Sequence, residues 1–136
     1  DTVGYQVKST WQSIVKMYNR ITMENDFSQA IGYVLINVKR DGVPVTKIAP
    51  LMGIEPTSLS RLLKTMEEKG LIYRKKDHVD RRVVKLFLTE KGMELKKISK
   101  KIVLDYNKMI KDEISDEELD VFFSVIKRIK KMTCEM

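Results

Sequence analysis

The sequence predicts a mainly α-helical protein with one small β-hairpin, and three observations indicate this fold. Amphipathic stretches with apolar residues at helical spacing occupy both ends of the chain. A shorter amphipathic helix is expected at residues 56–69, followed by Gly70, the usual residue where a helix ends in a left-handed conformation. Two β-rich runs, residues 71–76 and 83–88, are joined by a charged loop. With 136 residues, the chain has the size of one domain.

The N-terminal part is expected to hold two helices. The first should cover residues 3–23, because its apolar residues recur at intervals of three and four. Ser28 is a suitable N-cap for a second helix at residues 29–39, which is apolar on nearly all sides and should therefore be buried. Asp41-Gly42 indicates the turn that follows.

A short helix is expected next, between Pro44 and Met52. If Thr46 is its N-cap, Pro50 lies four residues inside and removes about one hydrogen bond, so this helix should be short or kinked. Gly53 is expected to form the turn to the following helix, which gives a helix–turn–helix.

The helix at residues 56–69 has one apolar face and several polar side chains. Leu59, Leu62, Leu63 and Met66 make the apolar face. The polar residues are Thr57, Ser58, Ser60, Arg61 and Lys64. Small hydroxyl groups let a helix approach the base edges of the DNA major groove, and an arginine can bond O6 and N7 of guanine together. We therefore expect these five residues to contact DNA.

The charged loop between the two β-rich runs carries adjacent arginines, Arg81 and Arg82. A β-hairpin with cations at its tip is a wing, which can straddle a phosphate backbone and insert an arginine into the minor groove. Lys75, Lys76 and Lys85 on the flanking runs are expected to contact phosphates.

The charge distribution also favours DNA as a partner. The chain has a formal net charge of +7 and a sequence pI of about 9.4. Residues 57–85 contain nine lysines and arginines against four aspartates and glutamates, a local net charge of +5. Most of the excess positive charge therefore lies in the helix and hairpin that are proposed to contact DNA. This position favours a nucleic acid over a membrane surface as the partner.

Two more helices are expected after the hairpin. Thr89 should cap a helix at residues 90–112, and Ser115 with Glu118 matches a capping box before the last helix. The apolar stripes of the first and last helices are longer than a small winged unit can cover. A second copy of the chain would bury them. A two-fold dimer would place its reading helices about 34–36 Å apart, which predicts a pseudo-palindromic site.

These motifs resemble a known family. The run Asp80-Arg81-Arg82, then Leu88-Thr89 and then Gly92 resembles the wing signature of the MarR family of bacterial winged helix–turn–helix regulators. The resemblance continues upstream through Gly53, Pro56 and Arg61, and in looser form covers residues 7–132. Glu55 departs from the family, which usually has Ser, Thr or Asp as the cap at this position, and glutamate caps poorly.

The resemblance implies a mainly α fold with a β-hairpin wing, in which the winged helix–turn–helix DNA-binding unit covers residues 30–92. Residues 1–25 and 93–136 would then form the helical region that joins a homodimer. Asp80 would brace Arg82, and Arg82 would enter the minor groove. The chain would be a transcriptional regulator, and we favour a repressor over an activator.

Four aromatic residues have two open interpretations: Trp11, Tyr18, Tyr33 and Tyr106. They are either packing residues or part of a small-molecule cavity between the dimer helices and the winged unit. The family often binds aromatic acids or other effectors there.

Several function classes find no support in the sequence. No catalytic motif, phosphate-binding glycine loop or metal-ligand spacing occurs, so we expect neither an enzyme nor a cofactor. His78 is the only histidine, and Cys134 is the only cysteine, which excludes an internal disulfide and fits a reducing compartment. No membrane-length apolar run or signal peptide is present, so we expect a cytoplasmic protein. The chain starts at Asp1, and we expect residues to precede it.

One alternative remains open at this point. A winged-helix module that serves protein interaction or dimerisation, without DNA binding, would share the same helices and hairpin. The basic set Arg61, Lys64, Arg81 and Arg82 discriminates between the two, because only DNA binding requires these cations.

Overall fold

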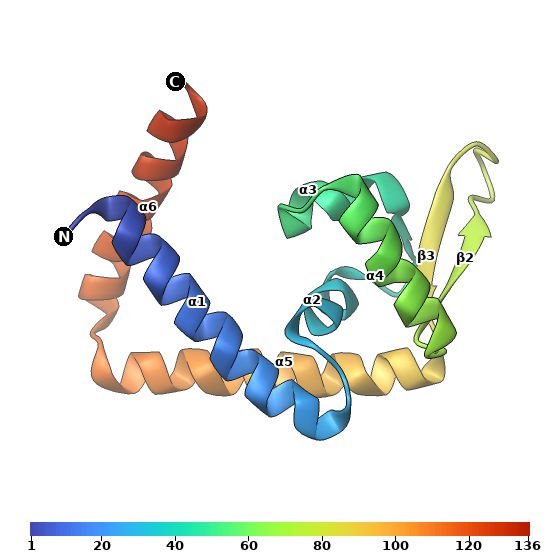
Figure 1. The fold of residues 1–136 in the computed structure, drawn as a ribbon, viewed down its shortest axis with the longest axis horizontal. Helices are drawn as coiled ribbons and strands as arrows, with labels where there is room; N and C mark the ends of the chain where they lie inside the picture. The colour runs from blue at the N-terminus through green and yellow to red at the C-terminus, as the bar shows by residue number, and fades with distance from the viewer. The chain divides into compact units, whose positions relative to one another are not determined.

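The computed structural model describes residues 1–136, and most of them are helical (Figure 1). The helices are α1 (Val3–Thr22), α2 (Gln29–Asn37), α3 (Ile48–Met52), α4 (Pro56–Glu68), α5 (Glu90–Glu113) and α6 (Asp116–Cys134), with short 3₁₀ turns η1 (Met23–Asn25) and η2 (Val45–Lys47). The strands are β1 (Val43–Pro44), β2 (Ile72–Lys76) and β3 (Val84–Leu88). The predicted mainly helical fold with one hairpin is confirmed. None of these helices combines the length and the apolar character that crossing a membrane requires.

The chain divides into two compact units, residues 1–102 and residues 103–136. Helix α5 begins in the first unit and ends in the second.

Helix α2 lies at the centre of the core of the first unit. Its residues Ile31, Val34 and Leu35 are buried, as the apolar run predicted, while Tyr33 is exposed. Ser28 caps the helix by accepting a hydrogen bond from the Ile31 N–H at 3.2 Å, which confirms the predicted cap. The helix ends at Asn37 instead of residue 39, because Val38 adopts an extended conformation and is itself buried.

The prediction for α3 was partly wrong. Thr46 is not its N-cap: Thr46 lies within η2, and the residue that precedes the α-helix is Lys47. Because α3 begins at Ile48, Pro50 occupies its third position, where the N–H of any residue would lack a helical partner. The proline therefore removes no intrahelical bond, and the helix is short, as expected.

A glycine lies on each side of α4, Gly53 in the turn before it and Gly70 after its end. Gly53 has φ 65° and donates to the Ala49 carbonyl at 2.9 Å, which makes the turn between α3 and α4. Gly70 has φ 71°, and the Leu71 N–H returns to the Met66 carbonyl at 2.9 Å. This pattern ends α4 with a left-handed residue, as the sequence indicated. Glu55 precedes α4 and makes no side-chain cap, also as expected.

The sheet contains one strand more than the sequence predicted. The strand order is β1-β3-β2, and both pairings are antiparallel. The missed strand, β1, has only two residues and pairs Val43 with Leu86 and Pro44 with Lys85. A strand this short has no recognisable periodicity, and its proline is tolerated because the strand lies at the sheet edge. Leu86, on the central strand, is fully buried.

The start of α5 is fixed against the turn between α4 and β2. The Thr89 N–H donates to the Leu71 carbonyl at 3.0 Å, and the Thr89 hydroxyl donates to the Gly70 carbonyl at 2.6 Å. The same hydroxyl accepts from the Gly92 N–H, so the predicted Thr89 cap is confirmed. A Cβ on Gly92 would lie 2.1 Å from the Leu71 carbonyl oxygen, so only glycine allows this approach.

The second unit contains the end of α5 and α6. Ser115 and Glu118 form the predicted capping box at the start of α6. Several large apolar side chains of α6 are exposed: Val121, Phe122, Phe123, Val125 and Met132.

Candidate nucleic-acid interface

Helix α4 presents a polar face opposite its buried one. Leu59, Leu63 and Met66 are buried in the core. Thr57, Arg61 and Lys64 follow one another at intervals of four and three, which places them on the opposite face, and all three are exposed. Neither Arg61 nor Lys64 forms an ion pair within the chain. Both cations are therefore available to an external partner.

The two serines of α4 lie beside this face. Ser58 is exposed, and Ser60 is exposed but donates its hydroxyl hydrogen to the Pro56 carbonyl at 3.0 Å. The Ser60 oxygen therefore retains only its capacity to accept a hydrogen bond.

The loop of the hairpin is stabilised by Asp77. Its side chain accepts hydrogen bonds from the N–H groups of Val79 and Asp80, at 3.1 and 2.9 Å, and its other oxygen pairs with the Lys85 ammonium at 3.1 Å. The Asp80 N–H and, next, the Lys85 ammonium lower the pKa of Asp77. The carboxylate thus stays ionised and holds the loop in one conformation.

Asp80 and Arg82 form a two-point contact at the outer end of the hairpin. The Arg82 Nε donates to Asp80 Oδ1 at 3.1 Å, and its Nη2 donates to Oδ2 at 3.2 Å. The Arg82 backbone N–H also donates to Oδ1. The Arg82 side chain lowers the pKa of Asp80. Since 91% of the Arg82 side chain is exposed, the carboxylate orients a guanidinium that otherwise projects into solvent.

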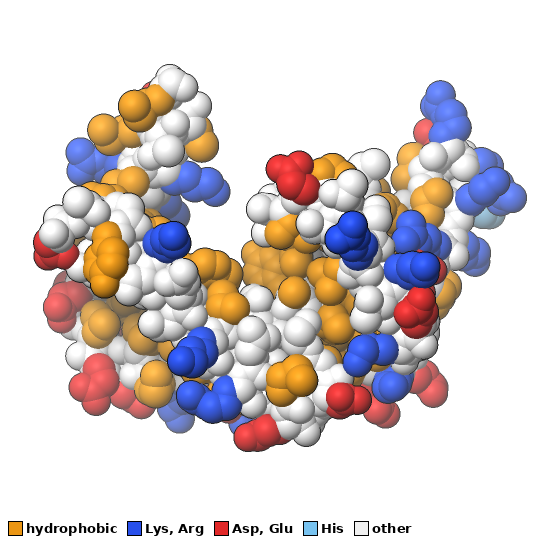
Figure 2. All heavy atoms as spheres, in the orientation of Figure 1, with side chains coloured by type: hydrophobic (Ala, Val, Ile, Leu, Met, Phe, Trp, Pro, Cys, Tyr) orange, Lys and Arg blue, Asp and Glu red, His pale blue; other side chains and the backbone are white.

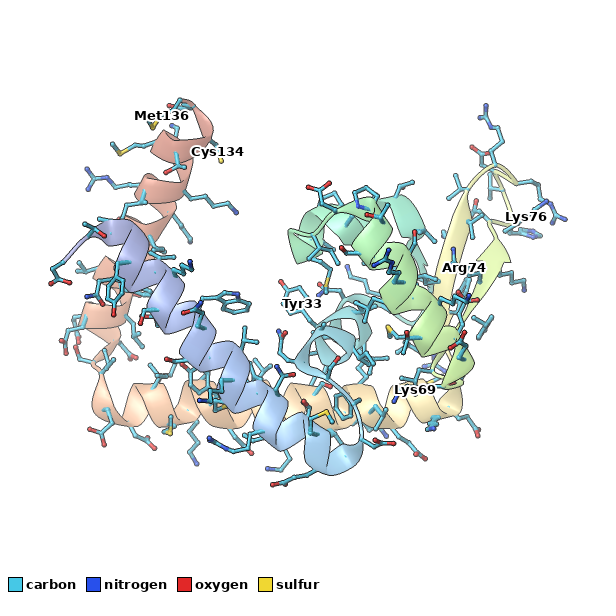
Figure 3. The ribbon with its side chains drawn as sticks, in the orientation of Figure 1. Tyr33, Lys69, Arg74, Lys76, Cys134 and Met136 are labelled. Carbon is cyan, nitrogen blue, oxygen red and sulfur yellow. The ribbon has the colours of Figure 1, made fainter.

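The other cations of the hairpin differ in availability. Arg81, Lys75 and Lys76 are exposed and form no ion pair within the chain. Lys85, directly opposite Lys75 in the register, is only 28% exposed and pairs with Asp77. Figure 2 shows Lys and Arg side chains gathered over the outer end of the hairpin, and Figure 3 shows Lys76 beside it.

An ion pair that the sequence analysis missed joins α4 to the hairpin. Arg74 Nε lies 2.7 Å from Glu67 Oε1, and the two side chains are 39% and 37% exposed. Figure 3 shows Arg74 on β2, on the side that faces α4. This contact links the hairpin to the helix. No sequence periodicity relates residues on a helix and on the following strand, so only the folded chain reveals it.

Three of the four predicted effector residues belong to the unit of residues 1–102. Trp11 on α1 is 52% exposed, and Tyr33 on α2 is 40% exposed. Tyr18 and Tyr106 are partly buried, and Tyr106 belongs to the second unit. Trp11 lines a shallow hollow with Gln12, Val15, Lys16 and Asn19, all of them on α1. No group of three or more His, Cys, Asp or Glu residues is arranged to hold a metal ion.

A short helix–turn–helix, an exposed polar helix face and a cationic hairpin define a winged helix–turn–helix protein. Comparison with known proteins agrees with this class. The MarR family model matches residues 38–84, which include α3, α4 and most of the hairpin. This segment of the chain is therefore similar to the MarR family, and it holds the helix–turn–helix and the first part of the wing.

Solved structures share the fold over nearly the whole chain. The transcriptional regulator SlyA matches with a TM-score of 0.87 and 22% identity, covering 99% of this chain and 96% of that one. S. aureus MepR, solved in a complex with DNA, matches with a TM-score of 0.87 and 21% identity over 98% of this chain and 99% of its own. A MarR family regulator from Listeria monocytogenes, solved with a 26mer DNA, gives a TM-score of 0.86 and 19% identity over 99% and 91%.

Proposed function

We propose that this protein is a MarR family transcription regulator, a repressor that binds a pseudo-palindromic operator as a homodimer. In this proposal α4 lies in the major groove, where Arg61 contacts a base edge and Thr57, Ser58, Ser60 and Lys64 contact bases or phosphates. The observation that carries the proposal is the pair of exposed, unneutralised cations on the outer face of α4, Arg61 and Lys64.

The hairpin supplies the second DNA contact. Arg82, oriented by Asp80, would enter the minor groove, while Arg81, Lys75 and Lys76 would contact the backbone phosphates. Lys85 would contribute less than the sequence suggested, since it already neutralises Asp77. The Glu67–Arg74 ion pair supports the simultaneous use of both elements, because it links the helix to the wing.

The homodimer is supported by apolar surface at both ends of the chain. Val3, Val7 and Trp11 are exposed on α1, and Phe122 and Phe123 are exposed on α6. Large exposed apolar side chains on amphipathic helices usually mark an interface. We assign dimerisation to residues 1–25 and 93–136 and DNA binding to residues 30–92. A two-fold axis would then set the half-sites one helical turn apart.

An effector would release the repressor by favouring a dimer geometry in which the two α4 helices no longer match the operator. We propose an aromatic or other organic acid as this effector, with Trp11, Tyr18 and Tyr33 of the first unit as its candidate contacts and Tyr106 of the second unit as a separate candidate. Occupancy by the effector lowers operator affinity because it shifts the population toward the mismatched geometry.

The test begins with selection of bound sequences from a random DNA pool by the full chain. We expect a pseudo-palindrome with half-site centres about 10 base pairs apart. Arg61→Ala should weaken binding by about 5- to 150-fold and relax the base preference at one position of each half-site. Lys64→Ala should weaken all sequences alike and reduce the salt slope by about 1.

Lys108→Ala is the matched control, because Lys108 is exposed and lies outside residues 30–92. Selection of a single half-site would contradict the homodimer. An affinity that does not change with salt concentration would favour the interaction module without DNA binding.

A further inference from the structure

A pocket on the back of the hairpin is lined by none of the residues proposed to contact DNA. It has a volume of about 580 Å³, within the range of small-molecule sites. Lining residues come from the segment after α2, from β2 and β3, and from the first half of α5. All of them belong to the unit formed by residues 1–102. Helix α5 begins below the base of the hairpin (Figure 1).

The strand register explains why this pocket faces away from α4. Arg74 and Leu86 are partners in the register and point to the face of the hairpin that carries the Glu67 ion pair and the core. Tyr73 and Phe87, one residue away on each strand, therefore point to the opposite face. Lys75 and Lys85, two residues further along each strand, share this opposite face, so the pocket faces away from α4 and adjoins the cationic end of the hairpin.

Two aromatic rings line the pocket. The rings of Tyr73 and Phe87 are stacked, with centroids 5.5 Å apart and an interplanar angle of 17°. Phe87 is held in place from the side of the turn, since a Cβ on Gly42 would lie 2.7 Å from its ring. Tyr73 remains 47% exposed, so it offers an open aromatic surface on which a flat ring can stack.

The charged residues of the pocket are all cations. They are Lys39, Arg40, Lys96, Lys97 and Lys100, and no carboxylate lines the pocket. Lys96 donates to the Val38 carbonyl at 2.6 Å, which holds its ammonium at the edge of the pocket. Burial and, to a smaller extent, the charge of Lys100 lower the pKa of Lys96. The five cations repel one another. An anion with a single charge would leave most of this repulsion in place, whereas a polyanion would neutralise it.

We propose that this pocket binds a nucleoside polyphosphate. Its base would stack on the exposed ring of Tyr73, and its phosphates would lie among the five cations. Stacking on aromatic side chains together with cationic contacts to phosphates is the general chemistry of nucleotide recognition. Because no carboxylate is present to share a divalent cation, the free polyphosphate is the ligand form, and Mg²⁺ competes with the protein for it.

The test is calorimetric titration of the full chain with ATP, inorganic triphosphate and adenosine, without Mg²⁺. ATP should bind most tightly, because only ATP has both the ring and the charge. The double variant Lys97→Gln/Lys100→Gln should weaken ATP at least about tenfold. Lys97 and Lys100 are both exposed, so the variant should fold, and circular dichroism checks this. Tyr73→Ser should weaken ATP several-fold and leave triphosphate unchanged. Added Mg²⁺ should weaken ATP.

Two controls separate this site from the DNA surface. Lys108→Gln/Lys111→Gln makes the same charge change at the same spacing on α5, and it should bind ATP as the unchanged protein does. Arg81→Gln/Arg82→Gln should lose operator affinity but keep ATP binding, so failure of the DNA proposal is distinguishable from failure of this one. The inference is overturned if triphosphate binds as tightly as ATP, or if both lysine pairs behave alike. Tighter binding of decanoate, an apolar chain with one charge, would also overturn it.

Discussion

The contact between Asp80 and Arg82 predicts that Asp80→Asn weakens operator binding when Arg82 is present and does not weaken it when Arg82 is replaced. The Asp80 carboxylate is the only partner of a guanidinium that is otherwise 91% exposed, and it holds that group by two hydrogen bonds. Asp80→Asn removes the charge that orients Arg82, and DNA must then immobilise a side chain with several free torsions. The ordering cost of one such side chain corresponds to a loss of about two- to tenfold in operator affinity.

The same substitution should act differently when Arg82 is absent. Arg82→Ala alone should weaken binding about 5- to 150-fold, because the minor-groove contact is lost. Asp80 then becomes an unneutralised carboxylate beside the DNA phosphates. Adding Asp80→Asn to Arg82→Ala should therefore leave affinity unchanged or improve it. If Asp80 orients Arg82, Asp80→Asn should therefore lower operator affinity in the unchanged protein and should not lower it in Arg82→Ala.

Fluorescence anisotropy with labelled operator at fixed salt measures all four proteins of this cycle. Glu24→Gln removes one exposed anion elsewhere and serves as the control for net charge. The reasoning is refuted if Asp80→Asn weakens binding equally in both backgrounds, since Asp80 would then act without Arg82. An improvement in both backgrounds would show only removal of a repulsive charge.

Two further predictions concern the close approach of α5 and the ionisation of the wing. Gly92→Ala places a Cβ 2.1 Å from the Leu71 carbonyl oxygen, so it should lower the free energy of unfolding by about 3 kcal/mol, whereas Gly4→Ala, with nothing within 4 Å, should not lower it. Urea denaturation at one protein concentration measures both, and equal effects would contradict the packing argument. The pKa of Asp80 lies below its usual 3.8, chiefly through the Arg82 side chain, so the stabilisation is present above pH 3.8 and is lost as pH falls through the lowered pKa. In an NMR titration, Arg82→Ala should raise the Asp80 pKa and leave that of Asp77 low; an unchanged Asp80 pKa would exclude the brace.

The local elements of this chain could be predicted from its sequence because their signals lie within a few residues of each other. The caps at Ser28 and Ser115 and the left-handed end at Gly70 follow from the chemistry of single turns. The exceptions were Thr46 and β1, whose segments are too short for a periodic signal.

The sequence by itself determined which side chains form the helix, the hairpin and their cationic surface, since helical and strand periodicities assign residues to faces. Only the tertiary structure decided which cations are free. It paired Arg74 with Glu67 and Lys85 with Asp77, and it left Arg61 and Lys64 without acidic partners. It also brought five cations from two segments, residues 39–40 and helix α5, around the rings of Tyr73 and Phe87. Ion pairs and pockets join residues that are distant along the chain, so their existence depends on how the elements pack and not on any local pattern.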